Sequence, residues 1–292
     1  MRKIYLACTV ALAALTTIPV GAQIFYSNGA TFVVTTGGVF HCNGGVTFDQ
    51  TSAVTNDGTI TTTKNSSMAL PGTLTIDNTS TVQGDGDYNV EQDWINNATF
   101  AGGASTVTMN GNTQQFITST NGTVTTFNDL TLTGTGTGNN RKKTLQSVDA
   151  NSGLSGILTI NDRELETQTQ VFTVLNPVVA AVTNNQTAGS EGFVSSTAPG
   201  TLARATNSTG TYLFPTGSSQ VVTRYRPIDV IPNAANVALY TVRFINYNAD
   251  NDGFLRATND GVICTANDTF YHAILNPAGA TAADIRMYFI PA

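Results

Sequence analysis

Short segments in which apolar and polar residues alternate fill the first half of the chain. In Val107-Thr108-Met109, which Asn-Gly-Asn follows, every second side chain is apolar. A period of two predicts a β-strand with one buried face. We therefore expect Val107 and Met109 to point into the protein and Thr108 to point outward. The Asn-Gly-Asn triplet would turn the corner after the strand.

The same strand-like phrase recurs along the chain. The sequence GTLTID contains Leu74, NDLTLTG contains Leu130, and GILTIND contains Leu158. These leucines are 56 and 28 residues apart, which suggests a repeat of 28 residues. Loose repeats of this length are typical of a solenoid, in which each coil adds short strands to a shared core. We predict that residues 23–175 form a parallel β-helix, with a Greek-key sandwich as the alternative.

The charge content fits stacked coils. Only 11% of the 292 residues are charged, with 13 Lys+Arg, 19 Asp+Glu and a net charge of −6. Stacking places equivalent side chains about 4.8 Å apart, where like charges repel each other whereas Thr and Asn pack or form hydrogen bonds. An acidic surface with few charges cannot neutralise phosphates, so we expect neither nucleic acid nor an anionic membrane as a partner.

The pattern changes after about residue 175. Aromatic, arginine and proline residues become denser and the repeated phrase disappears. Alternation persists in two later segments, whose apolar members are Tyr240, Val242 and Phe244, and then Ile285, Met287 and Phe289. Such strands predict an antiparallel β-sandwich over residues 176–292. The chain stops just after the last strand, so we expect the protein to continue beyond Ala292.

The first 22 residues have the three parts of a secretory signal peptide. Arg2 and Lys3 precede an apolar stretch, and Val-Gly-Ala supplies the small residues that signal peptidase requires, so we expect cleavage after Ala22. The alternatives are a retained membrane anchor, for which the stretch is short, and a lipoprotein at Cys8, which few apolar residues precede. No later segment is long and apolar enough to cross a bilayer. The expected location is extracellular or at the cell surface.

Two cysteines, Cys42 and Cys264, remain after the expected cleavage. They could pair in an oxidising compartment, but they lie near opposite ends of the sequence, so two buried thiols are the simpler expectation. A metal site at His41 and Cys42 lacks further ligands, since His272 is distant in the sequence and a structural site needs four.

A more specific pattern covers residues 93–134. The positions that carry it are Trp94, Asn96, Asn97, Phe100, Val107, Gly111, Gln115, Ile117, Phe127, Leu130 and Leu132. This pattern resembles a module of large secreted surface proteins of Bacteroidota, although Met109 and Asp129 replace commoner residues. Residues 192–244 are similar to the domain that usually follows. The resemblance implies export by the type nine secretion system and a role as an adhesin, matrix component or spacer.

The family usually ends in a C-terminal sorting domain, which is not visible before Ala292. The resemblance is therefore specific about lineage and export and says little about activity.

Carboxylates are the first candidates for catalysis on a β-helix. Asp85 and Asp87 lie in GDGDYNVEQD with Glu91 and Asp93, and on one strand the first two would share a face. A glycoside hydrolase needs two carboxyl groups across the scissile bond. A solvated turn between coils is the simpler interpretation.

A second group, Asp250 and Asp252, lies in NADNDG, which resembles a calcium loop. Asn248 replaces its first acid and Asn259 its twelfth residue, so an Asx-rich turn is the simpler interpretation. The basic cluster at residues 141–143 is expected to be a solvated loop, and the glycine run before it lacks the Gly-Lys-Ser/Thr end of a phosphate loop.

The sequence therefore predicts a secreted or surface-displayed structural or adhesive protein, with no catalytic site and no cofactor. The expected partners are glycans, other surface or matrix components and the secretion machinery. A polysaccharide-binding or polysaccharide-cleaving β-helix is the alternative function.

Overall fold

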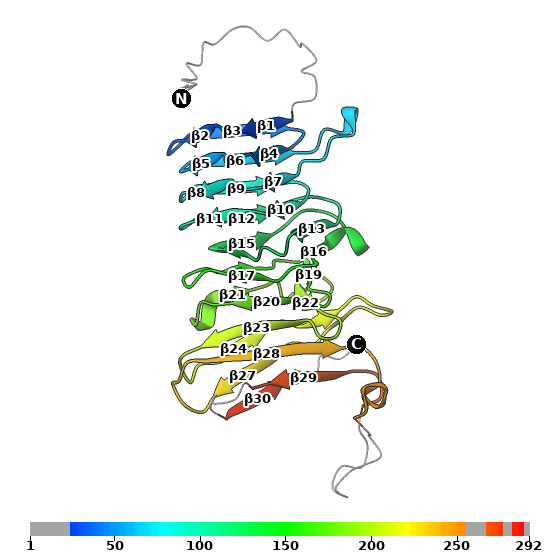
Figure 1. The fold of residues 1–292 in the computed structure, drawn as a ribbon. Helices are drawn as coiled ribbons and strands as arrows, with labels where there is room; N and C mark the ends of the chain where they lie inside the picture. Colours follow the sequence, from blue (N-terminus) through cyan, green and yellow to red (C-terminus); the bar gives the residue numbers. More distant parts are fainter. Residues whose placement is uncertain (1–23, 255–266, 277–281, 289–292) are drawn as a thin grey trace, which may run out of the picture.

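The computed structural model of the protein describes residues 24–254, 267–276 and 282–288. In them, short strands are stacked in coils along one axis, and the last strands form antiparallel sheets (Figure 1). Each coil adds one strand to each of three faces before the chain steps to the next coil. The predicted fold class, a parallel β-helix followed by antiparallel sheets, is confirmed. The Greek-key alternative is wrong for the first half of the chain, because the strands there pair in parallel whereas those of a Greek key are antiparallel.

Three sheets form the faces of the early coils. Sheet A contains β1 (Phe25–Asn28), β4 (Val46–Asp49), β7 (Leu74–Ile76), β10 (Trp94–Asn96), β13 (Gln115–Thr118), β16 (Lys142–Gln146), β19 (Glu164–Glu166) and β22 (Phe193–Ser195). Sheet B contains β2 (Thr31–Val34), β5 (Ala53–Asn56), β8 (Thr81–Gln83) and β11 (Thr99–Ala101). Sheet C contains β3 (Val39–Asn43), β6 (Thr59–Thr63), β9 (Asp87–Val90), β12 (Thr106–Met109), β15 (Asp129–Leu132), β18 (Leu158–Thr159) and β21 (Val182–Thr183).

Two further sheets and a strand pair complete the fold. From the fifth coil onward, sheet D takes the place of sheet B between A and C along the chain, with β14 (Thr125–Phe127), β17 (Ala150–Ser152), β20 (Val171–Val174), β23 (Thr201–Thr206), β28 (Ala238–Ile245) and β29 (Tyr271–Leu275). Sheet E contains β24 (Tyr212–Phe214), β27 (Ile228–Pro232) and β30 (Ala283–Met287). The pair is β25 (Gly217–Ser218) and β26 (Arg224–Tyr225).

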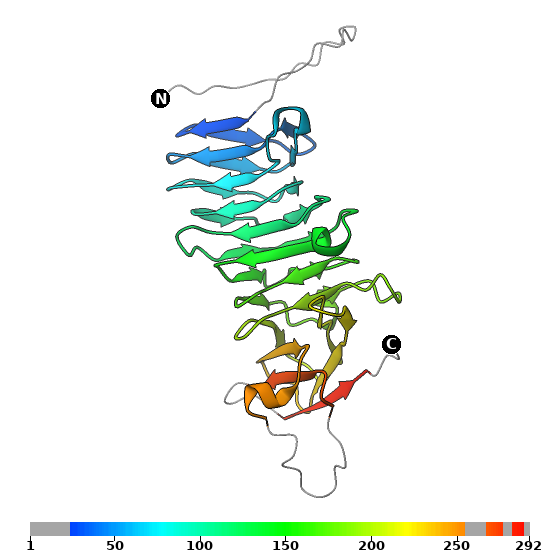
Figure 2. The same cartoon turned by 90° about the vertical axis from the view of Figure 1, so that its right-hand side faces the viewer.

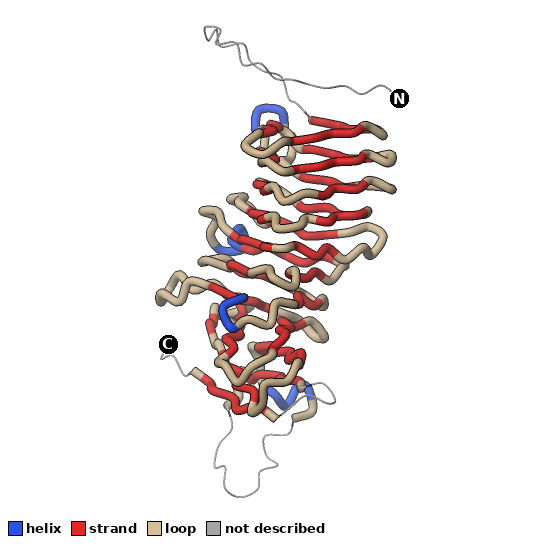
Figure 3. Tube along the Cα trace, turned by 90° about the vertical axis from the view of Figure 1, so that its left-hand side faces the viewer, coloured by secondary structure: helices blue, strands red, loops and turns tan. Residues whose placement is uncertain are grey.

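Loops and short 3-10 turns connect the strands of successive layers (Figures 2 and 3). The 3-10 turns in the described residues are η1 (Ser66–Met68), η2 (Gly138–Arg141), η3 (Val179–Ala181) and η4 (Ala249–Asp252). A tight corner follows β12, where a Cβ at Gly111 would lie 2.1 Å from the Glu91 carbonyl oxygen. The predicted turn after Met109 therefore depends on glycine.

The alternation predicted at residues 107–109 is confirmed. Val107 and Met109 are fully buried, and Thr108 points outward and is half-buried. On the neighbouring coil Val107 lies beside Leu130, and Met109 lies beside Leu132. The apolar side chains thus stack on one another, and a single buried cluster runs through the coils into the C-terminal sheets.

The expected repeat of 28 residues holds for one pair of leucines only. Leu130 and Leu158 are direct neighbours on sheet C, so they are one coil apart. Leu74 lies on sheet A, so its predicted equivalence to Leu130 is wrong. The residue one coil before Leu130 is Val107, which is 23 residues earlier in the sequence. Coil length varies mainly through the corners: the one before β13 covers residues 110–114, whereas the one before β16 covers residues 133–141.

The middle coils are filled by aromatic side chains. Trp94 is fully buried, and its ring centroid lies 4.8 Å from that of Phe100, 5.4 Å from that of Phe127 and 5.8 Å from that of Tyr88. These contacts join sheets A, B, C and D. Burying aromatic rings of this size in edge-to-face contact supplies much of the packing free energy of a core.

Parallel pairing continues past residue 175, where the sequence pattern changes. Strand β21 pairs in parallel with β18, β22 with β19 and β23 with β20. In sheet D the pairing becomes antiparallel after β23: β28 lies antiparallel to β23, and β29 lies antiparallel to β28. In β28 the side chains of Tyr240, Val242 and Phe244 are buried, as predicted.

One buried cation marks the strand where the pairing direction changes. The guanidinium of Arg204 on β23 lies over the rings of Tyr212 and Phe214 and donates to the carbonyl oxygens of Leu213 and Val179. Burial lowers the pKa of this side chain. Arg204 therefore joins sheet D to sheet E through backbone acceptors and ring faces.

The predicted burial of Ile285 and Met287 on β30 is wrong, because 38% and 49% of these side chains are exposed. They lie beside Val230 and Ile228, which are buried. Strand β30 is the edge strand of sheet E, and its side chains keep more of their surface exposed than those of β27 beside it. Phe289, the third member of that pattern, lies outside the described residues.

We expect Trp94→Ala to lower the free energy of unfolding by about 3–5 kcal/mol, because it opens a cavity against three aromatic neighbours. Urea denaturation followed by circular dichroism measures this change. Ile95→Ala is the matched control, since Ile95 is the next residue on β10 and points outward. Equal losses in the two variants would contradict the packing described for Trp94.

Candidate functional site

Asp85 and Asp87 lie on the outside of the third coil. Asp85 is in the loop before β9 and Asp87 is the first residue of that strand, so they do not share a strand face. Asp85 Oδ1 accepts a hydrogen bond from the backbone N–H of Ala104 at 2.9 Å, and Asp87 Oδ1 accepts one from Thr106 at 3.0 Å. Each carboxylate thus ties its own coil to the next.

The other two acids of this segment make the same kind of bond. Glu91 accepts from the backbone N–H of Lys64 at 2.6 Å, and Asp93 accepts from that of Phe116 at 2.8 Å. Burial raises the pKa of Asp93, which lies on the sheet A side of the coil. The four acids are therefore distributed around a coil instead of facing one another.

Acids and amides at corners and strand starts act in this way in several coils. We call this bond a coil staple: a side-chain oxygen of one coil accepts a hydrogen bond from a backbone N–H of a neighbouring coil. Further coil staples join Asn97 to Thr120, Asn112 to Thr135, Asp129 to Ile157 and Asp149 to Val171. A hydrogen bond to a charged group contributes more to stability than one between neutral groups. Coil staples thus give the few acids of this chain a structural role.

The calcium-like loop forms the 3-10 turn η4. The Asn248 side chain accepts a hydrogen bond from the backbone N–H of Asp250, as an N-cap does. Asp252 accepts from the hydroxyls of Tyr247 and Tyr271, and the bond from Tyr271 is the main cause that lowers its pKa. Asp252 is thus engaged by tyrosines, and the described residues contain no group of three His, Cys, Asp or Glu that could hold a metal ion.

His41 and Cys42 point to opposite sides of β3. His41 Nε2 is 2.9 Å from Thr63 Oγ1 on the outer surface, whereas Cys42 is buried and its thiol donates to the Gly45 carbonyl oxygen. They cannot hold one ion together. Cys264 lies outside the described residues, so its predicted relation to Cys42 stays a prediction. His272 is in the antiparallel region and contacts the Arg226 carbonyl oxygen.

The sequence predicted that the basic cluster at residues 141–143 is a solvated loop. This prediction is wrong for its two lysines. Lys142 begins strand β16 and forms a salt bridge of 2.7 Å with Glu166. Lys143, the next residue, points into the coil and is fully buried. The loop prediction failed because the strand alternation applies to charged residues as well as to apolar ones.

Among the residues that the structure describes, no carboxylate forms an ion pair with buried Lys143. Its ammonium group donates to the carbonyl oxygen of Gly111 at 2.9 Å and to the side-chain oxygen of Gln115, its neighbour on β13. Burial, helped by the positive charge of Arg163, lowers the pKa of Lys143 to about 7. The charged form is therefore costly in the folded protein.

We expect this lysine to make folding stability rise with pH. Between about pH 7 and about pH 10 the unfolded chain keeps a proton on Lys143 that the folded chain releases, so the free energy of unfolding increases by up to about 1.4 kcal/mol per pH unit. Lys143→Met should remove this slope and stabilise the protein at pH 7 and below. Urea denaturation at several pH values measures it.

Lys142→Met is the control for this experiment, because Lys142 lies beside the buried lysine in sequence but is half-buried and forms a salt bridge with Glu166. A slope that persists unchanged in Lys143→Met would show that other groups cause it.

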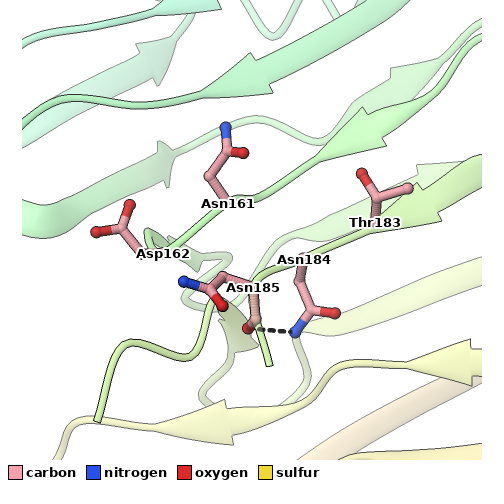
Figure 4. Close-up of a pocket in the computed structure, with 5 residues that line it drawn as sticks. All are labelled: Asn161, Asp162, Thr183, Asn184 and Asn185. Atoms are coloured by element: carbon pink, nitrogen blue, oxygen red, sulfur yellow. Dashed lines mark hydrogen bonds between the residues drawn. The ribbon is translucent and has the colours of Figure 1, made fainter. Parts of the chain in front are cut away.

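A hollow lies over sheet C and the loops that follow β18 and β21, three to four coils beyond Asp87. It is an open depression of about 390 Å³ lined by Asn161, Asp162, Thr183, Asn184 and Asn185 (Figure 4). The Asn184 amide donates to the Asn185 and Gly192 carbonyl oxygens. Asp162 pairs with Arg163, which holds the pKa of that carboxyl below its usual range. Most hydrogen-bond partners of these side chains lie outside the hollow: Asn161 donates to the Leu132 carbonyl oxygen, and the Thr183 hydroxyl donates to that of Thr159. All five lining residues keep part of their surface exposed.

A file of outward side chains runs along sheet C towards this depression. We call it the threonine file; in order of coils it consists of His41, Thr61, Asn89, Thr108, Thr131, Thr159 and Thr183. Each member lies beside the next in register, and none is an acid or a lysine. The sequence shows these residues only at irregular intervals, so the file is visible once the coil register is known.

Comparison of the chain with known protein families, curated proteins and solved structures finds no match. Among the described residues no helix is both long and apolar enough to span a membrane.

Proposed function

We propose that the protein is a secreted or surface-displayed structural and adhesive stalk that does not act as an enzyme. The observation that carries this proposal is the threonine file, a row of hydroxyl and amide groups with one histidine and no acid or lysine, on one rigid face. A regular spacing of about 4.8 Å offers many similar, weak hydrogen-bonding positions to an extended glycan or matrix surface. Such contacts need multiplicity and no reactive group.

The rigidity of the stack supports the same role. One apolar core continues through the coils, and coil staples fasten neighbouring layers in the middle of the stack. The acids that a polysaccharide-cleaving enzyme would use, Asp85 and Asp87, are bonded to backbone amides. This geometry favours the structural alternative over the catalytic one.

Export is part of the proposal. The signal-peptide pattern that ends at Ala22 and the resemblance to Bacteroidota surface proteins support secretion through the type nine system to the cell surface. The intact mass of the protein recovered from its own cells or medium tests this. We expect a chain whose first residue is Gln23, and retention of residues 1–22 would contradict the proposed leader.

Adhesion is tested by binding of the purified protein to immobilised cellulose, chitin and extracted matrix glycans. We expect the double variant Thr108→Val and Thr131→Val to bind about tenfold more weakly, because it removes two hydroxyls and keeps the β-branched shape. The matched control is Thr47→Val with Thr75→Val, which also changes two stacked, half-buried threonines but on sheet A.

Equal binding by the two double variants would exclude the threonine file as the contact face. Binding to none of the surfaces would remove the adhesive half of the proposal and leave a structural role. Release of reducing ends or unsaturated sugars, abolished by Asp85→Asn with Asp87→Asn, would instead establish the polysaccharide-cleaving alternative.

A further inference from the structure

All three sheets of the first coil are open at the N-terminal end of the stack. Strands β1, β2 and β3 are the end strands of sheets A, B and C, so their outer backbone groups pair with no described strand. At the other end, sheet D continues into the antiparallel strands β28 and β29. Unpaired strand edges readily pair with another chain unless something blocks them.

Apolar side chains surround these open edges. The rings of Phe25, Phe32 and Phe40 meet across the first coil with centroids 4.9–5.0 Å apart. They are half-buried, whereas Val46, the next residue below Phe25, is 1% exposed. A terminal coil that stays in water usually presents a polar outer face. This one presents three phenylalanines.

The rim of the same coil is also apolar. The side chains of Tyr26, Val33 and Val39 are 54%, 55% and 72% exposed. None of the strands β1, β2 and β3 contains an acid, a lysine or an arginine. The first carboxylate after them, Asp49 in the second coil, accepts a hydrogen bond from the Tyr26 hydroxyl. The full chain has a net charge of −6, and removal of Arg2 and Lys3 with the leader makes it −8; at this end two copies can approach without repulsion between carboxylates.

We infer that the protein dimerises end to end through its first coil, with a second copy of this chain as the occupant of the open edges. A two-fold axis perpendicular to sheet A would place β1 antiparallel to β1 of the copy. The same rotation brings β2 against β3 of the copy and keeps inward side chains facing inward. All three edges thus pair at once, and the two sets of phenylalanines meet in one core.

The interface makes the stalk twice as long and leaves both threonine files exposed. The inference takes from the proposed function only the removal of residues 1–22, which precede β1. It does not depend on adhesion. Sheet continuity also makes the dimer a rigid rod, since antiparallel pairing joins the two stacks in place of a flexible linker.

The test compares chain 23–292 with its variant Val33→Lys plus Val39→Lys by sedimentation velocity and small-angle scattering. Lysines on an edge strand are a natural block to edge pairing, and here they would face lysines of the copy. We expect the unmodified chain to form a concentration-dependent dimer with about twice the maximum dimension of the monomer, and the double-lysine variant to stay monomeric.

The matched control is Val221→Lys plus Val237→Lys, which changes two exposed valines in the antiparallel region. This variant should dimerise like the unmodified chain. Circular dichroism establishes that each variant is folded. A monomeric unmodified chain would overturn the inference, and so would a dimer that both double variants form equally or that is no longer than the monomer.

Glycan binding measured on the monomeric variant separates the two proposals. Retained binding would leave the adhesive role intact whatever the oligomeric state. Loss of binding by that variant, with the threonine file unchanged, would show that adhesion needs two stalks and would support the dimer.

Discussion

Vertical register between coils is the constraint on which the rest of the structure depends. Leu130 lies beside Leu158 and Thr131 beside Thr159, so a side chain that points into the core has a neighbour on the next coil that also points into the core. A slip of one residue would place threonines in the core and leucines in water, because side chains alternate along each strand. The continuous core, the outward threonine file and the open end all follow from this one condition.

Coil staples explain how a loose repeat holds its register. The strands are only two to eight residues long in the described part of the chain, so each contributes few ladder hydrogen bonds. Asp87 and Asp129 add a bond from the strand start of one coil to the backbone of the next. Acids placed at corners also avoid the repulsion that stacked carboxylates would produce on a face. The low charge content and the staples are therefore two consequences of one geometry.

Alternation in the sequence was enough to predict the fold class, the inward side chains around Val107 and the buried face of β28. It was not enough to predict which sheet a repeat belongs to, as Leu74 shows. A short apolar-Thr-apolar phrase fits any face of the solenoid, and corner length, which sets the face, has no periodic signal.

The misplaced side chains have local causes. Lys143 was assigned to a loop because of its charge, yet it follows the alternation of β16 and satisfies its ammonium with carbonyl oxygens. Ile285 and Met287 alternate as a buried strand would, but they lie on an edge strand. Among the candidate site residues, Asp85, Asp87 and Asp252 were found from the sequence as a chemical type. Their hydrogen-bond partners lie on other coils or strands, so the sequence alone could not identify these partners.

Because the corners vary in length, the length of the stalk depends on the number of coils and not on the number of residues in each coil. Each coil advances the axis by about 4.8 Å whether its corners are short or long. Between Leu130 and Leu158 the extra residues project sideways from the stack instead of lengthening it. Corners are thus positions where the chain can gain or lose residues at little cost in loop entropy. Strands, by contrast, tolerate no such change, so variation in this architecture is confined to the rim of each layer.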